Sequence, residues 1–185
     1  VEGAGSVLRV LNSVFVGCAA DSDADNPTCA LRGGAIAAWK GAKISIVAST
    51  LESHVTSQNG GALWLYRKYT DIGSPTQADL RGVTFRDNKA LGATWGQGGA
   101  IFANAILNIL GGDNVFVDNR AASESKGHTI FRGEDSNALA VSPILVDTCR
   151  PGTFQFSDLS SLAKGAGYSE DFIGCPDACP AGKTT

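Results

Sequence analysis

The residues best suited to catalysis are acids that recur at one place in a repeated pattern. The order Phe-x-Asp-Asn occurs at 85–88 and again, 31 residues later (116 − 85), at 116–119. If equivalent strands pair, Asp87 and Asp118 would lie about one strand spacing, ~4.8 Å, apart. Two carboxylates beside Arg86 form a candidate catalytic group. Two earlier copies of the pattern carry no acid there, so the sequence favours solvated turn residues over catalysis.

A second group of acids lies in the stretch CAADSDADNPTC at 18–29. Asp21, Asp23 and Asp25 alternate as the first ligands of a calcium loop do. The glycine and the closing glutamate of such a loop are absent, so calcium stays an alternative. The favoured interpretation is an acidic surface loop closed at its base by a Cys18–Cys29 disulfide.

The remaining cysteines also indicate disulfides rather than metal. The chain has five cysteines, no paired CxxC spacing and only two histidines, which argues against zinc. Disulfides imply an extracytosolic compartment. We expect Cys149 to pair with Cys175, which leaves Cys179 for a partner outside this sequence.

Aromatic residues follow three glycine-rich elements, in GGAIAAW, GGALWLY and GGAIF. They are Trp39, Trp64, Tyr66 and Phe102. Alternation along a strand would place Trp64 and Phe102 on the outer face, because the preceding Leu63 and Ile101 would point inward. An exposed aromatic stripe could bind sugar rings or a partner chain. The alternative is that a neighbouring loop or domain covers it.

The glycine element and the Phe-x-x-Asn element alternate along the chain. The glycine element begins at Gly33, Gly60 and Gly98, with a degenerate copy, GHTIF, at 127–131. The segments between them alternate at period two and are rich in Val, Ile, Leu, Phe and Thr, which indicates strands. An unevenly spaced repeat of this length predicts a solenoid rather than a propeller.

Equivalent positions should then stack. We expect two inward columns, formed by Ile36, Leu63, Ile101 and Ile130 and by Phe15, Leu51, Phe85 and Phe116. Asn88 and Asn119 should bend the chain and bind the backbone of their own turns. His54 and His128 stand where Asn and Gly are expected, and we interpret them as substituted turn residues rather than acid–base groups.

Composition limits the classes of partner. Only 18% of residues are charged, and the net charge is −3, so nothing favours nucleic acid or an anionic membrane. No apolar run approaches the ~20 residues of a membrane-spanning helix. The chain starts at Val1 without a signal sequence and ends in CPDACPAGKTT, and we interpret it as a piece of a longer protein.

The alternating GGA[I/L] and FxxN elements, over about residues 8–133, resemble the repeats of chlamydial polymorphic outer-membrane proteins, found also in large protist and algal surface proteins. That family resembles the right-handed parallel β-helix of pectin-lyase-like shape. The resemblance implies an all-β solenoid over residues 1–135, followed at 136–185 by a last coil, a cap and the start of a Cys-rich extracellular segment.

We therefore expect a non-enzymatic, extracellular or cell-surface β-helix segment of a large surface or filament glycoprotein. It would bind protein neighbours in an assembly or surface glycans, without a cofactor apart from the possible calcium. The alternative function is a polysaccharide lyase or hydrolase of pectin-lyase-like fold that uses Asp87, Asp118 and Arg86. Enzymes on this fold use acid clusters, often with a basic residue.

Overall fold

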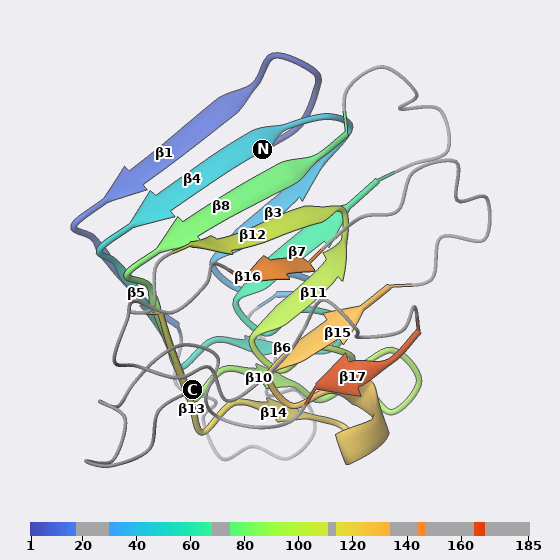
Figure 1. Ribbon diagram of the computed structural model, residues 1–185. Helices are drawn as coiled ribbons and strands as arrows, with labels where there is room; N and C mark the ends of the chain where they lie inside the picture. The colour runs from blue at the N-terminus through green and yellow to red at the C-terminus, as the bar shows by residue number, and fades with distance from the viewer. Residues whose placement is uncertain (18–29, 68–74, 111–113, 134–143, 147–164, 169–185) are drawn as a thin grey trace, which may run out of the picture.

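The structure is a computed structural model that describes residues 1–17, 30–67, 75–110, 114–133, 144–146 and 165–168 (Figure 1). These residues form an all-β protein, as the sequence predicts. Besides strands they contain one short 3-10 turn, Glu124–Lys126. The strands arise where β-branched and aromatic residues alternate with polar ones, because successive side chains point to opposite faces. Within the described ranges, no helix is long and apolar enough to cross a membrane.

The strands form four sheets, numbered in the order in which the complete repeat β4 to β7 visits them. Sheet 1 contains β1 (Val7–Leu11), β4 (Lys43–Val47), β8 (Gln77–Arg81), β12 (Ile106–Leu110) and β16 (Ile144–Val146). Sheet 2 contains β2 (Val14–Val16), β5 (Thr50–Glu52), β9 (Thr84–Arg86) and β13 (Val115–Val117). Sheet 3 contains β6 (Val55–Thr56), β10 (Lys89–Ala90) and β14 (Arg120–Ala121). Sheet 4 contains β3 (Ile36–Trp39), β7 (Leu63–Tyr66), β11 (Ile101–Asn104), β15 (Ile130–Arg132) and β17 (Gly167–Tyr168).

Each repeat visits the sheets in the same order. Strands β4 to β7 make one repeat, β8 to β11 the next and β12 to β15 the one after. In the first repeat, β1 to β3, an isolated bridge from Ala30 to Thr56 takes the place of a strand in sheet 3. Neighbouring repeats pair in parallel and in register, and the strands of sheet 1 lie side by side in chain order in Figure 1. The exception to parallel pairing among the described strands is β17, which is antiparallel to β15.

The inward columns form as predicted. Ile36 pairs with Leu63, Leu63 with Ile101 and Ile101 with Ile130, and all four side chains are buried. The second column likewise aligns Phe15, Leu51, Phe85 and Phe116. The rings of the last two stack, with centroids 4.9 Å apart and planes 4° from parallel. Both columns belong to one continuous core, so burial of their apolar side chains is the main stabilising contribution to the stack.

The two glycines of each element have different roles. The first has positive φ in every repeat, between 55° and 70°, at Gly33, Gly60, Gly98 and Gly127. The second must lack a side chain, because a Cβ on Gly99 would lie 2.0 Å from the carbonyl oxygen of His128 in the next repeat. His128 holds this second position in the last repeat, where the next strand of sheet 4 is the antiparallel β17. The departure from glycine therefore coincides with the end of parallel pairing in sheet 4.

Asn88 and Asn119 are buried, but they bind different groups from those predicted. Asn88 Nδ2 donates to the carbonyl oxygen of Leu51 at 2.9 Å, and Asn119 Nδ2 donates to that of Phe85 at 3.1 Å. Their Oδ1 atoms accept from the backbone N–H groups of His54 and Asn88, at 3.2 and 3.1 Å. Each amide thus binds the backbone of the preceding repeat rather than its own turn. These buried bonds fix the register between repeats.

Candidate aromatic binding groove

Aromatic side chains form a cluster separate from the core, on the outward side of sheet 4. Leu63 and Ile101 belong to the core, whereas Trp64 and Phe102 belong to this second cluster. These two side chains therefore point away from the core, as the alternation predicts. Trp39, Tyr66 and Phe131 are also part of the cluster. Strands β3, β7, β11 and β15 position all five, because in-register pairing aligns one outward position with the next.

The rings of this cluster pack on one another. Trp64 stacks on Tyr66 with centroids 5.2 Å apart and planes within 5°, and Trp39 meets Trp64 at 5.9 Å and 60°. Phe102 and Phe131 stack at 5.9 Å and 7°. Trp64 and Phe102 keep only 8% and 7% of their surface exposed. Such ring pairs contribute about 0.5–1.5 kcal/mol each to stability beyond their burial. Because these two rings are nearly buried, the aromatic side chains form a packed layer rather than the exposed stripe that the sequence predicted.

This layer forms the floor of a groove with a volume of about 730 Å³. The lining residues are aromatic, amide-bearing, hydroxyl-bearing or cationic, together with one glycine. They are Arg32, Asn59, Trp64, Tyr66, Trp95, Gln97, Phe102, Asn104, Ser125, Lys126, Phe131 and Gly165. A second hollow of about 550 Å³ shares Arg32, Trp64 and Tyr66 with the groove and extends over Trp39. The predicted aromatic residues thus lie together, divided between two adjoining hollows.

Trp95 is a groove residue that the sequence pattern did not single out. Its side chain is 58% exposed, far more than the rings of the floor. It stands between Gly92 and Gly96, whose backbone groups bond to each other at 2.6 Å (Gly96 N–H to Gly92 C=O). Trp95 lies in the loop between β10 and β11 rather than in a repeated element, so periodicity could not identify it. The available signal was a tryptophan inside a glycine-rich loop.

Two cations border the groove and each is held in place. Arg32 Nε donates to Gln58 Oε1 at 2.6 Å, and its guanidinium carbon lies 5.2 Å from the centre of the Trp64 ring. Lys126 Nζ donates to the backbone carbonyls of Ala93 and Thr94, which directly precede Trp95. In the described part of the chain, no carboxylate lines the groove. The groove is therefore an apolar floor with a polar, positively charged border.

Asp87 and Asp118 lie at equivalent turn positions, as predicted, with φ of +50° and +55°. Asp87 forms an ion pair with Lys89 at 2.9 Å, and Asp118 is exposed. Arg86 extends instead toward Glu52, at 3.9 Å. Neither acid lines either hollow. These acids follow sheet 2, whereas the groove lies on sheet 4, so the two candidate sites are separate.

The two histidines have structural partners. His54 Nε2 lies 3.2 Å from the carbonyl oxygen of Phe15, so this nitrogen carries the proton and donates. The bond reproduces the one that Asn88 makes to Leu51 one repeat later. Burial is the main cause that lowers the pKa of His54, opposed by the Phe15 bond and by the charge of Glu52.

His128 accepts a bond at Nδ1 from the backbone N–H of Ala121, at 3.0 Å. It does not line either hollow. Both histidines therefore replace turn residues of the repeat, in agreement with the interpretation from sequence.

The predicted disulfides and the calcium alternative concern residues outside the described ranges. Cys18, Cys29, Cys149 and Cys175 all lie there, and so do the three acids Asp21, Asp23 and Asp25. The predicted boundary at residue 135 also falls in an undescribed stretch. Among the described residues, no group of three or more His, Cys, Asp or Glu side chains is arranged to hold a metal ion.

No protein-family model matches the chain, and comparison with curated proteins and with solved structures finds no significant match.

Proposed function

We propose that the chain is a segment of a right-handed parallel β-helix, a solenoid of pectin-lyase-like shape. The support is the order of the four sheets, which recurs in each repeat through in-register parallel pairs. The handedness follows the general rule that connections between parallel strands are right-handed. In the same proposal, residues 136–185 supply the last coil, a cap and the start of a Cys-rich extracellular segment.

The function that the geometry supports best is binding rather than catalysis. We propose a non-enzymatic, extracellular structural or adhesive segment of a large surface or filament glycoprotein. It holds a protein neighbour or a surface glycan against the outward side of sheet 4. The observation that carries this proposal is the groove, whose aromatic floor, amides and cations can hold a ligand.

The alternative function is cleavage of a polysaccharide by Asp87 and Asp118 with the help of Arg86. The observation in its favour is that the two acids occupy equivalent positions on neighbouring repeats. Against it, Lys89 pairs with Asp87, and Arg86 is directed toward Glu52. Neither acid lines either of the two hollows described, which could position a substrate for reaction.

Retention and cleavage can be measured on the same samples. The 185-residue chain is passed over immobilised polysaccharides, and both retained protein and newly released sugar ends are quantified. We expect retention without release, a loss of retention in Trp95→Ala, and no change in the double variant Asp87→Asn, Asp118→Asn. Release of sugar ends by the unmodified chain that disappears in the double variant would overturn the binding proposal in favour of the enzyme.

A further inference from the structure

We infer that the groove on sheet 4 binds an anionic saccharide, a short stretch of polysaccharide bearing carboxylate or sulfate groups. This inference rests on the proposed binding function of the same groove and names the class of ligand. Arg32 and Lys126 provide the charge, Trp95 an exposed ring face, and the amides of the border the hydrogen bonds to sugar hydroxyls.

The charge of the groove differs from that of the chain. The sequence has 15 basic and 18 acidic residues, a net charge of −3, which opposes non-specific attraction of polyanions. The described lining of the groove, in contrast, carries Arg32 and Lys126 and no carboxylate. Anionic groups are therefore favoured here more than over the molecule as a whole, and this complementarity is local.

The uncharged lining suits sugar rings. Trp95 is 58% exposed and offers a flat apolar face to the C–H groups of a sugar. Asn59, Gln97 and Asn104 bear amides, which have both donors and acceptors, as hydroxyl groups require. The volume of about 730 Å³ lies within the range of about 300–1,000 Å³ typical of small-ligand sites. The site therefore fits a few linked sugar rings rather than the surface of a folded partner.

Both cations are fixed before any ligand arrives. Arg32 is held by its Nε bond to Gln58 and by its position over Trp64, so the two terminal nitrogens of its guanidinium retain donors for a ligand. That planar fork matches the paired oxygens of a carboxylate or sulfate. Lys126 is anchored to the loop that carries Trp95. Fixed side chains lose less conformational entropy on binding, which favours affinity.

The test is a calorimetric titration of the 185-residue chain with four probes of similar length. They are a sulfated heparin hexasaccharide, a carboxylated alginate hexasaccharide, a neutral dextran hexasaccharide and a hexaglutamate peptide. We expect one or both anionic saccharides to bind at least about tenfold more tightly than the dextran and the peptide, with affinity that falls as salt is added. The two anionic probes distinguish sulfate from carboxylate recognition.

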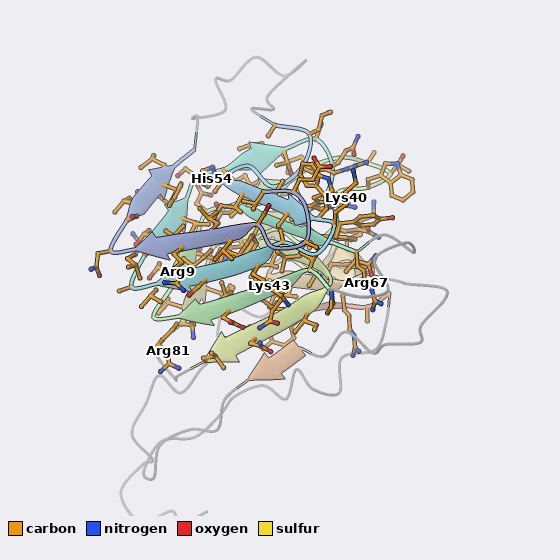
Figure 2. All side chains as sticks on the ribbon, turned by 90° about the horizontal axis from the view of Figure 1, so that it is seen from above. Arg9, Lys40, Lys43, His54, Arg67 and Arg81 are labelled. Atoms are coloured by element: carbon orange, nitrogen blue, oxygen red, sulfur yellow. The ribbon has the colours of Figure 1, made fainter. Side chains whose placement is uncertain are left out.

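Charge-neutral variants locate the site. Arg32→Gln should weaken binding about tenfold, the scale of one lost charged hydrogen bond. Arg81→Gln is the matched control, since Arg81 is exposed at the end of β8 in sheet 1 (Figure 2), and it should bind as the unmodified chain does. Lys126→Arg should retain affinity and Lys126→Gln should lose it. Thermal unfolding verifies that each variant is folded.

Three results would overturn the inference. They are equal affinity for dextran and the anionic saccharides, equal losses in Arg32→Gln and Arg81→Gln, or binding of hexaglutamate as tight as that of the saccharides. Equal affinity for dextran, or tight binding of hexaglutamate, would leave a chain that binds a ligand, so the proposed function would survive. Equal losses in the two arginine variants would place the binding outside the groove. Release of sugar ends, in contrast, would overturn the proposed function even if binding depended on Arg32.

Discussion

Leu63, Trp64 and Leu65 are consecutive on β7, yet they belong to two regions with different requirements. Leu63 lies in an inward column, where Ile36 and Ile101, which are of similar size, pair with it. Leu65 lies in the same core, where its register partners are the smaller Ala38 and Ala103. Trp64 lies in the outward cluster, where its register partners are Ala37 and Phe102. The column through Leu63 holds a large aliphatic residue in every repeat, whereas the outward side changes from repeat to repeat. A uniform inward column stabilises the stack, and the variation of outward residues allows a binding site to form at one place along it.

The largest predicted loss of stability comes from replacing the second glycine of a glycine element, where the backbones of neighbouring repeats are in contact. In Gly99→Ala, the new Cβ would lie 2.0 Å from the carbonyl oxygen of His128, so the two repeats must separate. We expect a loss of more than about 4 kcal/mol in the free energy of unfolding, measured by urea denaturation. Gly5→Ala is the control, because its Cβ meets nothing within 4 Å and only its φ of +88° is strained. It should lose about 1–2 kcal/mol; equal losses would mean that backbone contact between repeats is unimportant.

A pair of phenylalanines compares the two regions with the same substitution. Phe85 is fully buried and stacked on Phe116 in the core, so Phe85→Ala should lower the free energy of unfolding by about 3–5 kcal/mol. Phe102→Ala removes a ring from the floor of the groove, where water can enter, and should lower it by about 2 kcal/mol. Thermal and urea unfolding of both variants check this order. The reverse order would mean that the floor of the groove contributes more to the free energy of unfolding than the inward columns do.

A pair of asparagines makes a similar comparison among polar side chains. Asn88→Ala leaves the Leu51 carbonyl and the His54 N–H without their amide partner, which should lower the free energy of unfolding by about 2–3 kcal/mol. Asn104→Ala, on the lining of the groove, should reduce saccharide affinity more than stability. Unfolding and titration experiments on both variants separate these effects. If Asn104→Ala were the more destabilising variant, the outward side would contribute to stability as Asn88 and Asn119 do.

The inward region could be predicted from the sequence because its determinants are local and repeated. Ile101 and Phe116 each belong to a short repeated motif. Parallel in-register pairing then aligns each of them with the residue at the same motif position in the neighbouring repeat. The partner of Asn88 was predicted wrongly, since sequence shows a turn residue but not which backbone its side chain reaches. The groove was predicted only in part. Arg32 and Trp95 lie in connections between the repeated strands, where no periodicity operates and the positions depend on tertiary packing.

The smallest predicted effect concerns His54, which occupies the repeat position held by Asn88 and Asn119 in the next two repeats. Its pKa is lowered chiefly by burial, so the folded state holds the ring neutral while the unfolded chain binds a proton near pH 6.5. The unfolded state then binds more protons as the pH falls through this value. Stability contributed by the neutral ring is present above about pH 6.5 and declines below it, toward the lowered pKa of the folded state.

His54→Asn should therefore remove one source of acid sensitivity without disturbing the fold. The new amide can donate to the carbonyl of Phe15, as Asn88 does to that of Leu51. We expect the difference in urea midpoint between about pH 7.5 and about pH 5.5 to be smaller in the variant than in the unmodified chain. His128→Asn is the comparison, because the ring of His128 accepts from the backbone of Ala121 in β14 of sheet 3 and does not occupy the repeat position of Asn88. An unchanged pH dependence in His54→Asn would mean that His54 binds protons equally in the folded and unfolded states, contrary to its burial.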